Sequence, residues 1–336
     1  MSRPTVSVLL PVRDGGEKLD GAMTSLVTQS FEDFEVVVID DGSADDTADR
    51  LAGWAGRDPR IVVERQGPAG IVAALERARR SARGRYLARM DADDVAEPGR
   101  LEAQVGLLRD RPELAACGCG VRYFPPEAVQ EGARRYERWI NGVRTPREIA
   151  ESIFVECPIA HPTLVVRTEA LASVGGWSDR PWPEDYDLIL RLWAGGHRLG
   201  KVPDVLHLWR ERPDRLSRTD PRYSARAFLA CKVHHLRQTL LAEGRSAVIW
   251  GAGPIGKALA RALIAAGTPV DAFVELDPRK IGQEIHGGPV LATEDGARVR
   301  GPLHLAAVGQ VGARERILAL LRAAGYTPLR DFVPVA

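Results

Sequence analysis

Three aspartates follow a short apolar run near residue 90. The run 86–88 leads into Asp91, Asp93 and Asp94. Carboxylate oxygens are hard ligands, and a strand that ends in such a cluster presents them at a sheet edge, where a divalent cation can bridge them to a phosphate-bearing substrate. Acidic loops after strands are also common as plain solvated turns. The residues alone leave both interpretations open, metal-assisted handling of a nucleoside diphosphate or a turn.

A second acidic pair opens a predicted helix. Glu184 and Asp185 follow Pro183, and apolar residues from Leu188 to Trp193 supply the helix with buried faces. The positive end of the helix dipole favours the ionised form of a carboxylate there. From the residues alone, such a carboxylate fits an acidic first turn that caps the helix.

The elements that must position these side chains alternate between apolar runs and helical stretches. Strands are predicted at 6–10, 36–39 and 61–63, and helices at 19–29, 46–54 and 69–82. Near-continuous Val, Ile and Leu strands separated by helices predict a doubly wound α/β fold with a parallel sheet. Ligands of such sheets lie beyond the carboxyl ends of the strands. We therefore expect four polar segments to converge on one rim, namely 11–14, 40–43, 64–66 and 91–94.

The middle of the chain is less regular. A helix is predicted at 100–109 and a strand near 114–123, whereas the polar segment 125–147 is predicted to be an excursion or mobile loop. An amphipathic helix is expected between Tyr223 and Glu243 and is interpreted as a connector, although basic amphipathic helices also lie on membranes.

A new unit is predicted from Ala247. A strand, a turn with Gly251, Gly253 and Gly256, a helix and a strand ending at Glu275 follow the order of a Rossmann unit and its dinucleotide fingerprint. Three uses stay open, in descending order: a packing or dimerisation domain, a nucleotide or nucleotide-sugar binding module, and an active dehydrogenase. The predicted domains are 1–220, a helical connector 221–243, and 244–336.

Composition restricts the partners. Lys and Arg number 46 against 45 Asp and Glu, a formal charge of +1, so no global field attracts nucleic acid. No apolar run approaches the roughly 18 to 20 residues that span a bilayer. The four cysteines lack paired spacing and the N-terminus lacks a secretory signal. We expect a reduced cytoplasmic protein without nucleic-acid partners, and leave peripheral contact with the inner membrane face and a homodimer open.

From Pro11 to Leu188 the chain resembles glycosyltransferase family 2, the inverting nucleotide-sugar enzymes of the GT-A fold. The resemblance rests on ordered motifs: PVRD at 11–14, DDGSxDxT at 40–47, RMDADD at 89–94, PxRLxxQ at 98–104, HPT at 161–163, GGW at 175–177 and EDYDL at 184–188. The segment 274–291 is similar to the small Rossmann-like domain of sugar-nucleotide acetyltransferases, which binds nucleotide sugars.

The resemblance implies roles for individual residues. Asp41 would contact the base or ribose of the donor, with Pro11 and Arg13 lining the same pocket. Asp91 would lie by the ribose, and Asp93 would ligate Mg²⁺ or Mn²⁺ on the diphosphate.

The acceptor side carries the general base in this family. The resemblance implies that Asp185 removes the proton of the acceptor hydroxyl. Glu184, His161, Trp177 and Arg212 would have acceptor or secondary roles.

The implied activity is that of an inverting hexosyltransferase in surface polysaccharide synthesis. The donor would be a UDP- or TDP-sugar and the acceptor a hydroxyl of a glycan or lipid-linked molecule. The alternatives are a nucleotide-binding regulatory protein on the same fold, and an NAD-dependent oxidoreductase acting through the C-terminal domain.

The sequence departs from the family pattern at three places. Arg212 stands where relatives often carry a histidine that approaches the metal, and His207 is expected to end a strand instead of replacing it. Asp14 and Glu76 stand where many relatives have Asn. Arginine cannot ligate a cation but can neutralise a diphosphate, so the metal dependence is expected to be weaker than in relatives.

Overall fold

The computed structural model describes residues 3–310 and 312–336, which form two compact units. The first unit takes the chain up to Ile149 together with Pro158–Arg180 and Asp187–Thr219. The second unit takes Ala150–Cys157, Pro181–Tyr186 and Asp220–Ala336. Each unit is therefore assembled from segments that are not contiguous in the sequence.

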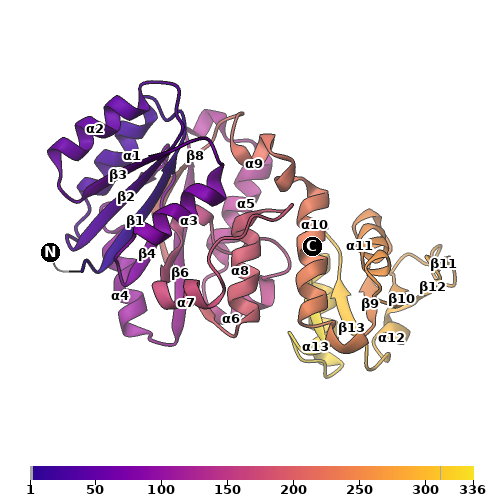
Figure 1. The fold of residues 1–336 in the computed structure, drawn as a ribbon. Coiled ribbons are helices and arrows are strands. Elements are labelled where there is room, and N and C mark those ends of the chain that lie inside the picture. The colour runs from indigo at the N-terminus through magenta and orange to yellow at the C-terminus, as the bar shows by residue number, and fades with distance from the viewer. Residues whose placement is uncertain (1–2, 311) are drawn as a thin grey trace. The chain divides into compact units, whose positions relative to one another are not determined.

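The first unit is built on an eight-stranded mixed sheet (Figure 1). Its order is β3-β2-β1-β4-β7-β6-β8-β5. Strands β1 to β4 run parallel, as predicted, whereas β7 is antiparallel to both β4 and β6. The bounds are β1 Val6–Val12, β2 Phe34–Asp41, β3 Ile61–Gln66, β4 Tyr86–Arg89, β5 Val95–Ala96, β6 Leu114–Phe124, β7 Val165–Arg167 and β8 Arg198–Arg210.

Helices cover both faces of this sheet. Val6, Val8 and Leu10 share a buried core with α1, α2 and α4, while Leu9 and Val37 alternate to the opposite face, where α3 packs on β1 and β2. The doubly wound arrangement is thus confirmed. The helices up to residue 219 are α1 Lys18–Val27, α2 Thr47–Arg57, α3 Ile71–Ser81, α4 Arg100–Asp110, η1 Pro126–Ala128, α5 Glu131–Gly142, α6 Pro146–Ser152, η2 His161–Thr163, α7 Thr168–Ser173, α8 Glu184–Ala194 and α9 Leu216–Thr219.

The prediction of a mobile loop at 125–147 is wrong. This segment forms η1, α5 and the start of α6. Tyr136, Trp139 and Ile140 recur at helical spacing, and they pack with Val121 and Ala160. Most Arg and Glu residues of α5 are exposed, whereas Glu137 accepts from the N–H of Tyr123 in β6 at 2.7 Å. The apolar stripe is therefore too narrow for the sequence pattern to indicate a helix.

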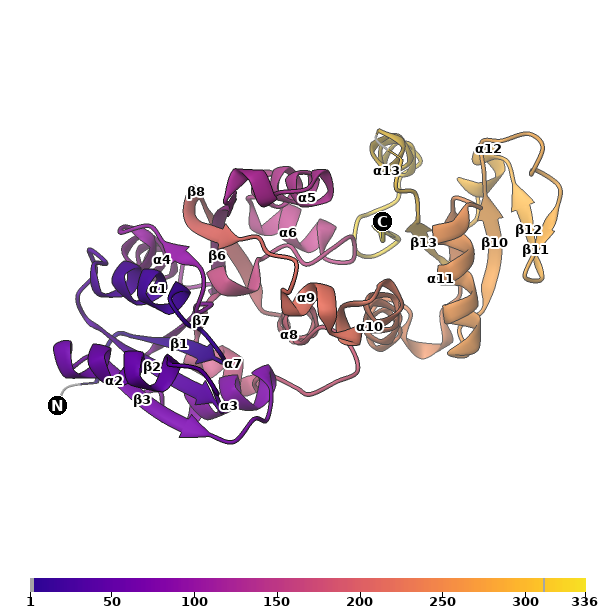
Figure 2. The ribbon, with the colours of Figure 1, turned by 90° about the horizontal axis from the view of Figure 1, so that it is seen from above.

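The second unit contains a smaller six-stranded sheet (Figure 2). Its order is β11-β12-β10-β9-β13-β14, and the predicted strand, glycine turn, helix and strand from 247 to 274 are confirmed. The bounds are η3 Pro221–Tyr223, α10 Ala225–Gln238, η4 Ala242–Gly244, β9 Ala247–Trp250, α11 Pro254–Ala265, β10 Val270–Val274, β11 Glu284–Ile285, β12 Gly288–Leu291, α12 Thr293–Gly296, β13 Leu303–Ala306, α13 Ala313–Ala323 and β14 Phe332–Pro334.

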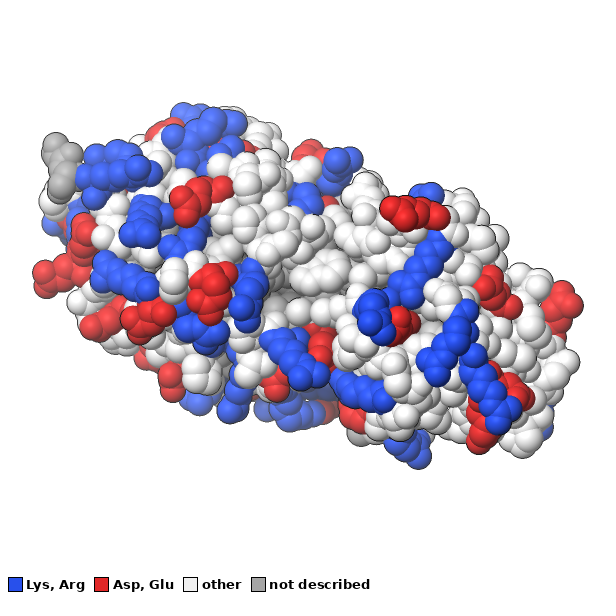
Figure 3. All heavy atoms as spheres, turned by 90° about the horizontal axis from the view of Figure 1, so that it is seen from below, with Lys and Arg blue, Asp and Glu red and all other residues white. Residues whose placement is uncertain are grey.

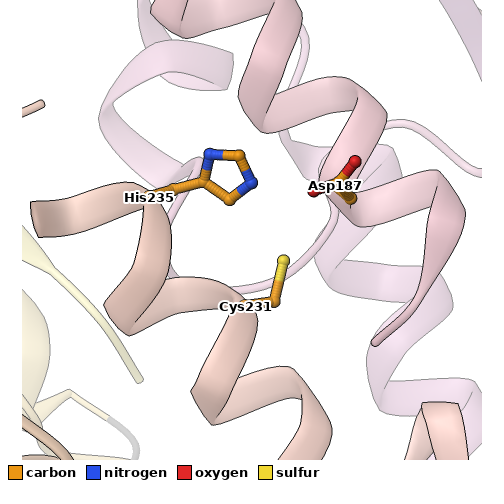
Figure 4. A group of neighbouring side chains, drawn as sticks. All are labelled: Asp187, Cys231 and His235. Carbon is orange, nitrogen blue, oxygen red and sulfur yellow. The ribbon is translucent and has the colours of Figure 1, made fainter. Parts of the chain in front are cut away.

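The cysteines are buried free thiols. Cys117 and Cys119 lie in β6, where burial raises the pKa of both, that of Cys119 to about 11. Cys231 lies one turn before His235 on α10, and both are buried (Figure 4). Asp187 on α8 accepts a hydrogen bond from Arg191 of its own helix at 2.7 Å. The described thiols are thus part of packed elements.

Charge is mixed over the surface. Figure 3 shows Lys and Arg interspersed with Asp and Glu over the face in view, in keeping with the formal charge of +1. Among the described residues, no helix combines the length and the apolar character that crossing a bilayer requires.

A buried arginine ties α4 to the middle of the sheet. Arg100 Nη2 donates to the carbonyl oxygens of Arg89 and Pro162, each at 2.7 Å. Its Nε donates to Gln104 Oε1 at 3.1 Å, and Gln104 Nε2 donates to Thr163 O at 2.8 Å. Arg100 and Gln104 therefore hold the segment 161–163 against the end of β4.

We expect the substitution Arg100→Leu to lower the free energy of unfolding by about 3 kcal/mol or more, because it leaves two buried carbonyl oxygens without donors. Urea unfolding followed by circular dichroism measures this. The matched control is Arg109→Leu, an exposed position of the same helix, with a change within about 0.5 kcal/mol. Equal effects of the two substitutions would contradict the role of Arg100.

Candidate functional site

The loops after β1, β2 and β3 are joined by hydrogen bonds. The backbone N–H of Asp14 donates to Ser43 Oγ at 2.9 Å, and the Asp14 carboxylate accepts from the N–H of Ala44 at 2.8 Å. Arg65 donates to Ser43 O at 3.0 Å. Of the four segments expected to converge, hydrogen bonds join these three, and the fourth, 91–94, follows β4, which pairs with β1. A ligand beyond these strand ends would face the three joined segments.

Asp41 is the carboxylate that organises this part of the rim. It is 5% exposed, and its Oδ1 accepts from Gln66 Nε2 at 2.7 Å and from the N–H of Ala69 at 2.8 Å. Its Oδ2 accepts from the N–H of Gly70 at 2.8 Å. Asp41 thus fixes the turn that leads into α3, and its contact with a donor stays a prediction.

Two further predicted donor residues lie at the end of β1. Pro11 is half-buried within the strand, and Arg13 is exposed just after it, with its Nε 3.8 Å from Asp14 Oδ2. Arg13 is therefore able to move toward an anionic ligand without breaking a close contact.

Asp91 is half-buried at the end of β4 and is paired with a buried arginine. Arg89 Nη1 forms an ion pair with Asp91 Oδ1. Burial alone would raise the pKa of Asp91, but the charge of Arg89 and its hydrogen bond, with His161 and Arg215 further away, lower it below its usual range. Asp91 is therefore held ionised.

The pKa of Asp93 is shifted in the opposite direction to that of Asp91. Burial and the charges of Asp91 and Asp94 raise its pKa to about 6, while Arg212 acts in the other direction. Arg212 Nε lies 2.8 Å from Asp93 Oδ2, and Arg210 Nε donates to the backbone oxygen of Asp93 at 2.7 Å. The end of β8 thus supplies positive charge to the aspartate cluster.

Asp94 lies beneath the cluster and is fully buried. Its Oδ1 accepts from the N–H of Arg210 at 2.7 Å, and its Oδ2 lies 2.8 Å from His207 Nε2. Burial raises the pKa of Asp94 and lowers that of His207, whose Nδ1 faces Arg100 at 3.3 Å. A neutral imidazole that accepts from Arg100 and donates to Asp94 satisfies all three groups. His207 lies within β8, three residues before the end of the strand where it was expected.

His161 and Trp177 are brought together. The indole N–H of Trp177 donates to His161 Nε2 at 2.9 Å, and both side chains are buried. The backbone N–H of Trp177 donates to Glu76 Oε1 at 2.7 Å, and Glu76 also pairs with Arg79 at 2.7 Å. Glu76 therefore anchors the Gly-Gly-Trp turn to α3.

Glu184 and Asp185, the acidic pair expected to include the general base, begin α8 and belong to the second unit. Glu184 is 1% exposed, and both of its oxygens accept from the hydroxyl of Tyr223, at 2.8 and 2.6 Å. Asp185 is half-buried, and its Oδ1 accepts from the N–H of Tyr186 at 2.7 Å. Glu184 is thus held inside the fold, whereas Asp185 is the more accessible carboxylate.

The carboxylate of Glu275 binds the glycine turn of the second unit. Glu275 Oε2 accepts from the N–H of Ala252 at 3.1 Å and pairs with Lys280 at 3.0 Å. Gly251 has a φ of 108°, and a Cβ on Gly256 would lie 1.9 Å from the Gly251 carbonyl oxygen. Gly256 therefore serves close packing, and Gly253 precedes α11.

Sequence reasoning gave no role to several side chains of the site. Arg89 pairs with Asp91, and the Arg210 side chain donates to the backbone oxygen of Asp93. Arg100 supports the cluster together with Asp94 and His207. The signal for Arg89 was its place directly before the acidic motif, because buried carboxylates require a counter-charge. The partners from β8 are more than a hundred residues away and only the fold brings them in.

The family model described as Glycosyl transferase family 2 matches residues 7–173. The amylovoran biosynthesis glycosyltransferase AmsE of Erwinia amylovora is 28% identical over 203 residues, which cover 60% of this chain and 74% of the relative. The O-antigen biosynthesis glycosyltransferase WbnJ of Escherichia coli is 26% identical over 243 residues, covering 70% of this chain and 89% of the relative.

Two solved structures share the fold. TarS 1-349 of S. aureus in complex with UDP-GlcNAc has a TM-score of 0.55 and 16% identity, covering 77% of this chain and 71% of its own. The mannosyltransferase PcManGT from Pyrobaculum calidifontis, in complex with GDP-Man and Mn2+, has a TM-score of 0.53 and 20% identity, covering 98% of this chain and 83% of its own. The expected GT-A fold is confirmed.

We expect the carboxyl group of Asp93 to titrate near pH 6 in the metal-free protein, because burial and the neighbouring carboxylates raise its pKa. Carbon-13 NMR of labelled aspartate measures this. The substitution Arg212→Gln removes the cation that favours the charged form, so the pKa should rise further. Arg111→Gln, which breaks an exposed ion pair with Glu113, is the control and should leave Asp93 unchanged. Titration near pH 4 would contradict this interpretation.

Proposed function

The chain belongs to glycosyltransferase family 2, and from this premise we propose that it moves a sugar from a UDP- or TDP-sugar to a hydroxyl of a glycan or lipid-linked acceptor, with inversion. The proposal rests on Asp91 and Asp93, which follow the carboxyl end of β4. This strand pairs with β1, and hydrogen bonds join the segments at the ends of β1, β2 and β3. Ligands of such sheets bind there.

The donor nucleotide would lie along the first three loops. Pro11 and the more mobile Arg13 line one side, and the turn fixed by Asp41 lines the other. Asp91, held ionised by Arg89, is suited to accept hydrogen bonds from ribose hydroxyls.

A divalent cation fits the aspartate cluster. Burial and two neighbouring carboxylates raise the pKa of Asp93, so its charged form is disfavoured in the metal-free protein and a bound cation would stabilise it. Asp93 would hold Mg²⁺ or Mn²⁺, which, when bound, would offset the negative charge that develops on the leaving diphosphate. Arg212 pairs with Asp93 in this structure. Its guanidinium could also neutralise the phosphate groups of the donor.

Asp185 is proposed as the general base. It would take the proton of the acceptor hydroxyl as that oxygen attacks the anomeric carbon from the face opposite the diphosphate, and this single displacement inverts the configuration. Its greater exposure supports Asp185 over Glu184, whose oxygens are both engaged by Tyr223. His161 and Trp177, fixed by their mutual hydrogen bond, are proposed to line the acceptor side.

The relatives named for amylovoran and O-antigen biosynthesis support surface polysaccharide as the product class. We place the reaction in the cytoplasm, with peripheral contact at the inner membrane face and a homodimer as further proposals. We propose the domain limits 1–220, 221–243 and 244–336, with a packing role for the C-terminal domain, because Glu275 and Lys280 occupy its glycine turn.

The substitution Asp185→Asn tests the proposed function. We expect sugar transfer to fall by about a hundredfold or more, because asparagine cannot accept the proton, while UDP and TDP still bind. Transfer is measured by release of the nucleoside diphosphate, and binding by calorimetry. The control is Asp110→Asn at an exposed position of α4. Unchanged transfer would rule out Asp185 as the base, and failure of UDP, TDP, GDP and CDP to bind would overturn the donor assignment.

The substitution Arg212→Gln tests the charge balance at Asp93. We expect the affinity for Mn²⁺ to rise about tenfold, or 1.4 kcal/mol, because the cation no longer competes with the guanidinium. Affinity for UDP without metal should fall, since one positive charge is lost. Electron paramagnetic resonance of free Mn²⁺ gives the first value and calorimetry the second. Weaker Mn²⁺ binding in the variant, with Arg111→Gln unchanged, would show that Arg212 supports the cation.

A further inference from the structure

A half-open cavity of about 470 Å³ lies within the second unit. Its walls are apolar and come from α10, through Phe228 and Leu229, and from α11, through Ile255 and Leu259. Pockets of about 300 to 1,000 Å³ with apolar walls and a few polar groups are the usual form of small-molecule sites. The cavity therefore has the size and the lining of a ligand site.

Lys232 is one of the polar groups of this cavity. Its Nζ donates to the backbone oxygens of Val155 at 2.7 Å and Val335 at 3.0 Å. An ammonium group has three donors. Within the described part of the chain these are its two hydrogen bonds, so one N–H is left for an occupant.

Glu156 is the second polar group. Its Oε1 accepts from the N–H of Cys157 at 3.1 Å, and among the described residues none donates to its Oε2. Burial raises the pKa of Glu156 and lowers that of Lys232, and the charge of each acts against this shift in the other. Among the side chains that line the cavity, Glu156 thus offers an acceptor and Lys232 a donor, and apart from Tyr223 the others are apolar.

Tyr223 also lines the cavity, but its hydroxyl is committed. That hydroxyl donates to both oxygens of Glu184, at 2.8 and 2.6 Å. A single O–H proton shared between two buried acceptors leaves the ring of Tyr223 as its contribution to the cavity wall. Glu156 and Lys232 are therefore the groups that would recognise the polar end of an occupant.

We propose that this cavity binds a small amphipathic alcohol, with its hydroxyl between Glu156 and Lys232 and its apolar part against α10 and α11. A hydroxyl is both donor and acceptor. Its O–H can donate to Glu156 Oε2 while its oxygen accepts from Lys232. The charge of Glu156 would repel a carboxylate, and the charge of Lys232 would repel an ammonium group. A neutral hydroxyl avoids both repulsions.

The test compares three eight-carbon probes on the full-length chain: 1-octanol, octanoate and octylammonium. Methyl NMR of Ile255 and Leu259 follows binding at the cavity itself. We expect 1-octanol to bind tightest and to lose about fourfold in affinity per methylene removed, the equivalent of 0.8 kcal/mol. Tighter binding of octanoate or octylammonium would overturn the alcohol assignment, and no shift with any probe would overturn the site.

Variants separate the cavity from the surface. Ala258→Phe on α11 fills the cavity and should abolish binding, whereas Ala265→Phe, exposed on the same helix, should not. Glu156→Gln keeps the size of the side chain and removes its charge, so octanoate should gain affinity severalfold. Binding of 1-octanol that survives Ala258→Phe would contradict the proposal. Because these measurements need no sugar transfer, they stand or fall independently of the proposed activity.

Discussion

The concentration of negative charge directly after β4 is the constraint on which the first unit depends. Asp91, Asp93 and Asp94 lie within four residues; Asp94 is buried, and Asp91 and Asp93 are half-buried. Uncompensated carboxylates in such surroundings cost several kcal/mol each. The chain compensates them unequally: Arg89 forms an ion pair with Asp91, whose pKa is lowered, whereas Asp93 keeps a raised pKa despite its arginine. Under the proposed function this inequality would serve the site, because a site that receives a cation or a phosphate cannot be neutralised completely by its own side chains.

This constraint explains why the long strand β8 belongs to the site. Residues 207–212 bring His207 beneath Asp94 and place Arg210 and Arg212 over Asp93. Arg100 connects the same histidine to the backbone at the end of β4. A chain of buried hydrogen bonds in which each member has its partner is rigid, because breaking any one leaves a buried polar group unsatisfied. The acidic motif is thus positioned by two distant segments that meet only in the folded sheet.

The sequence predicted the parallel half of the sheet because its strands are short, apolar and separated by helices of regular period. It also placed Asp91 and Asp93 at a strand end, because the acids follow the apolar run directly. It failed at α5, where Tyr136, Trp139 and Ile140 form a stripe too narrow to outweigh the charged residues around it. Partners supplied by β8 could not be predicted, since no local pattern records which distant arginine faces a given carboxylate.

Both units use a carboxylate to satisfy backbone amides at a strand-to-helix turn, and the two cases differ in what remains for a ligand. Asp41 accepts from the N–H groups of Ala69 and Gly70. It forms no ion pair with a lysine or arginine of the described residues. Glu275 accepts from the N–H of Ala252 and is also neutralised by Lys280. A carboxylate that keeps its charge and free lone pairs can still recognise ribose hydroxyls, whereas one paired with a lysine has less to offer. The two carboxylates therefore differ in pairing: Asp41 is bound by backbone and amide donors, and Glu275 by a backbone donor and a lysine.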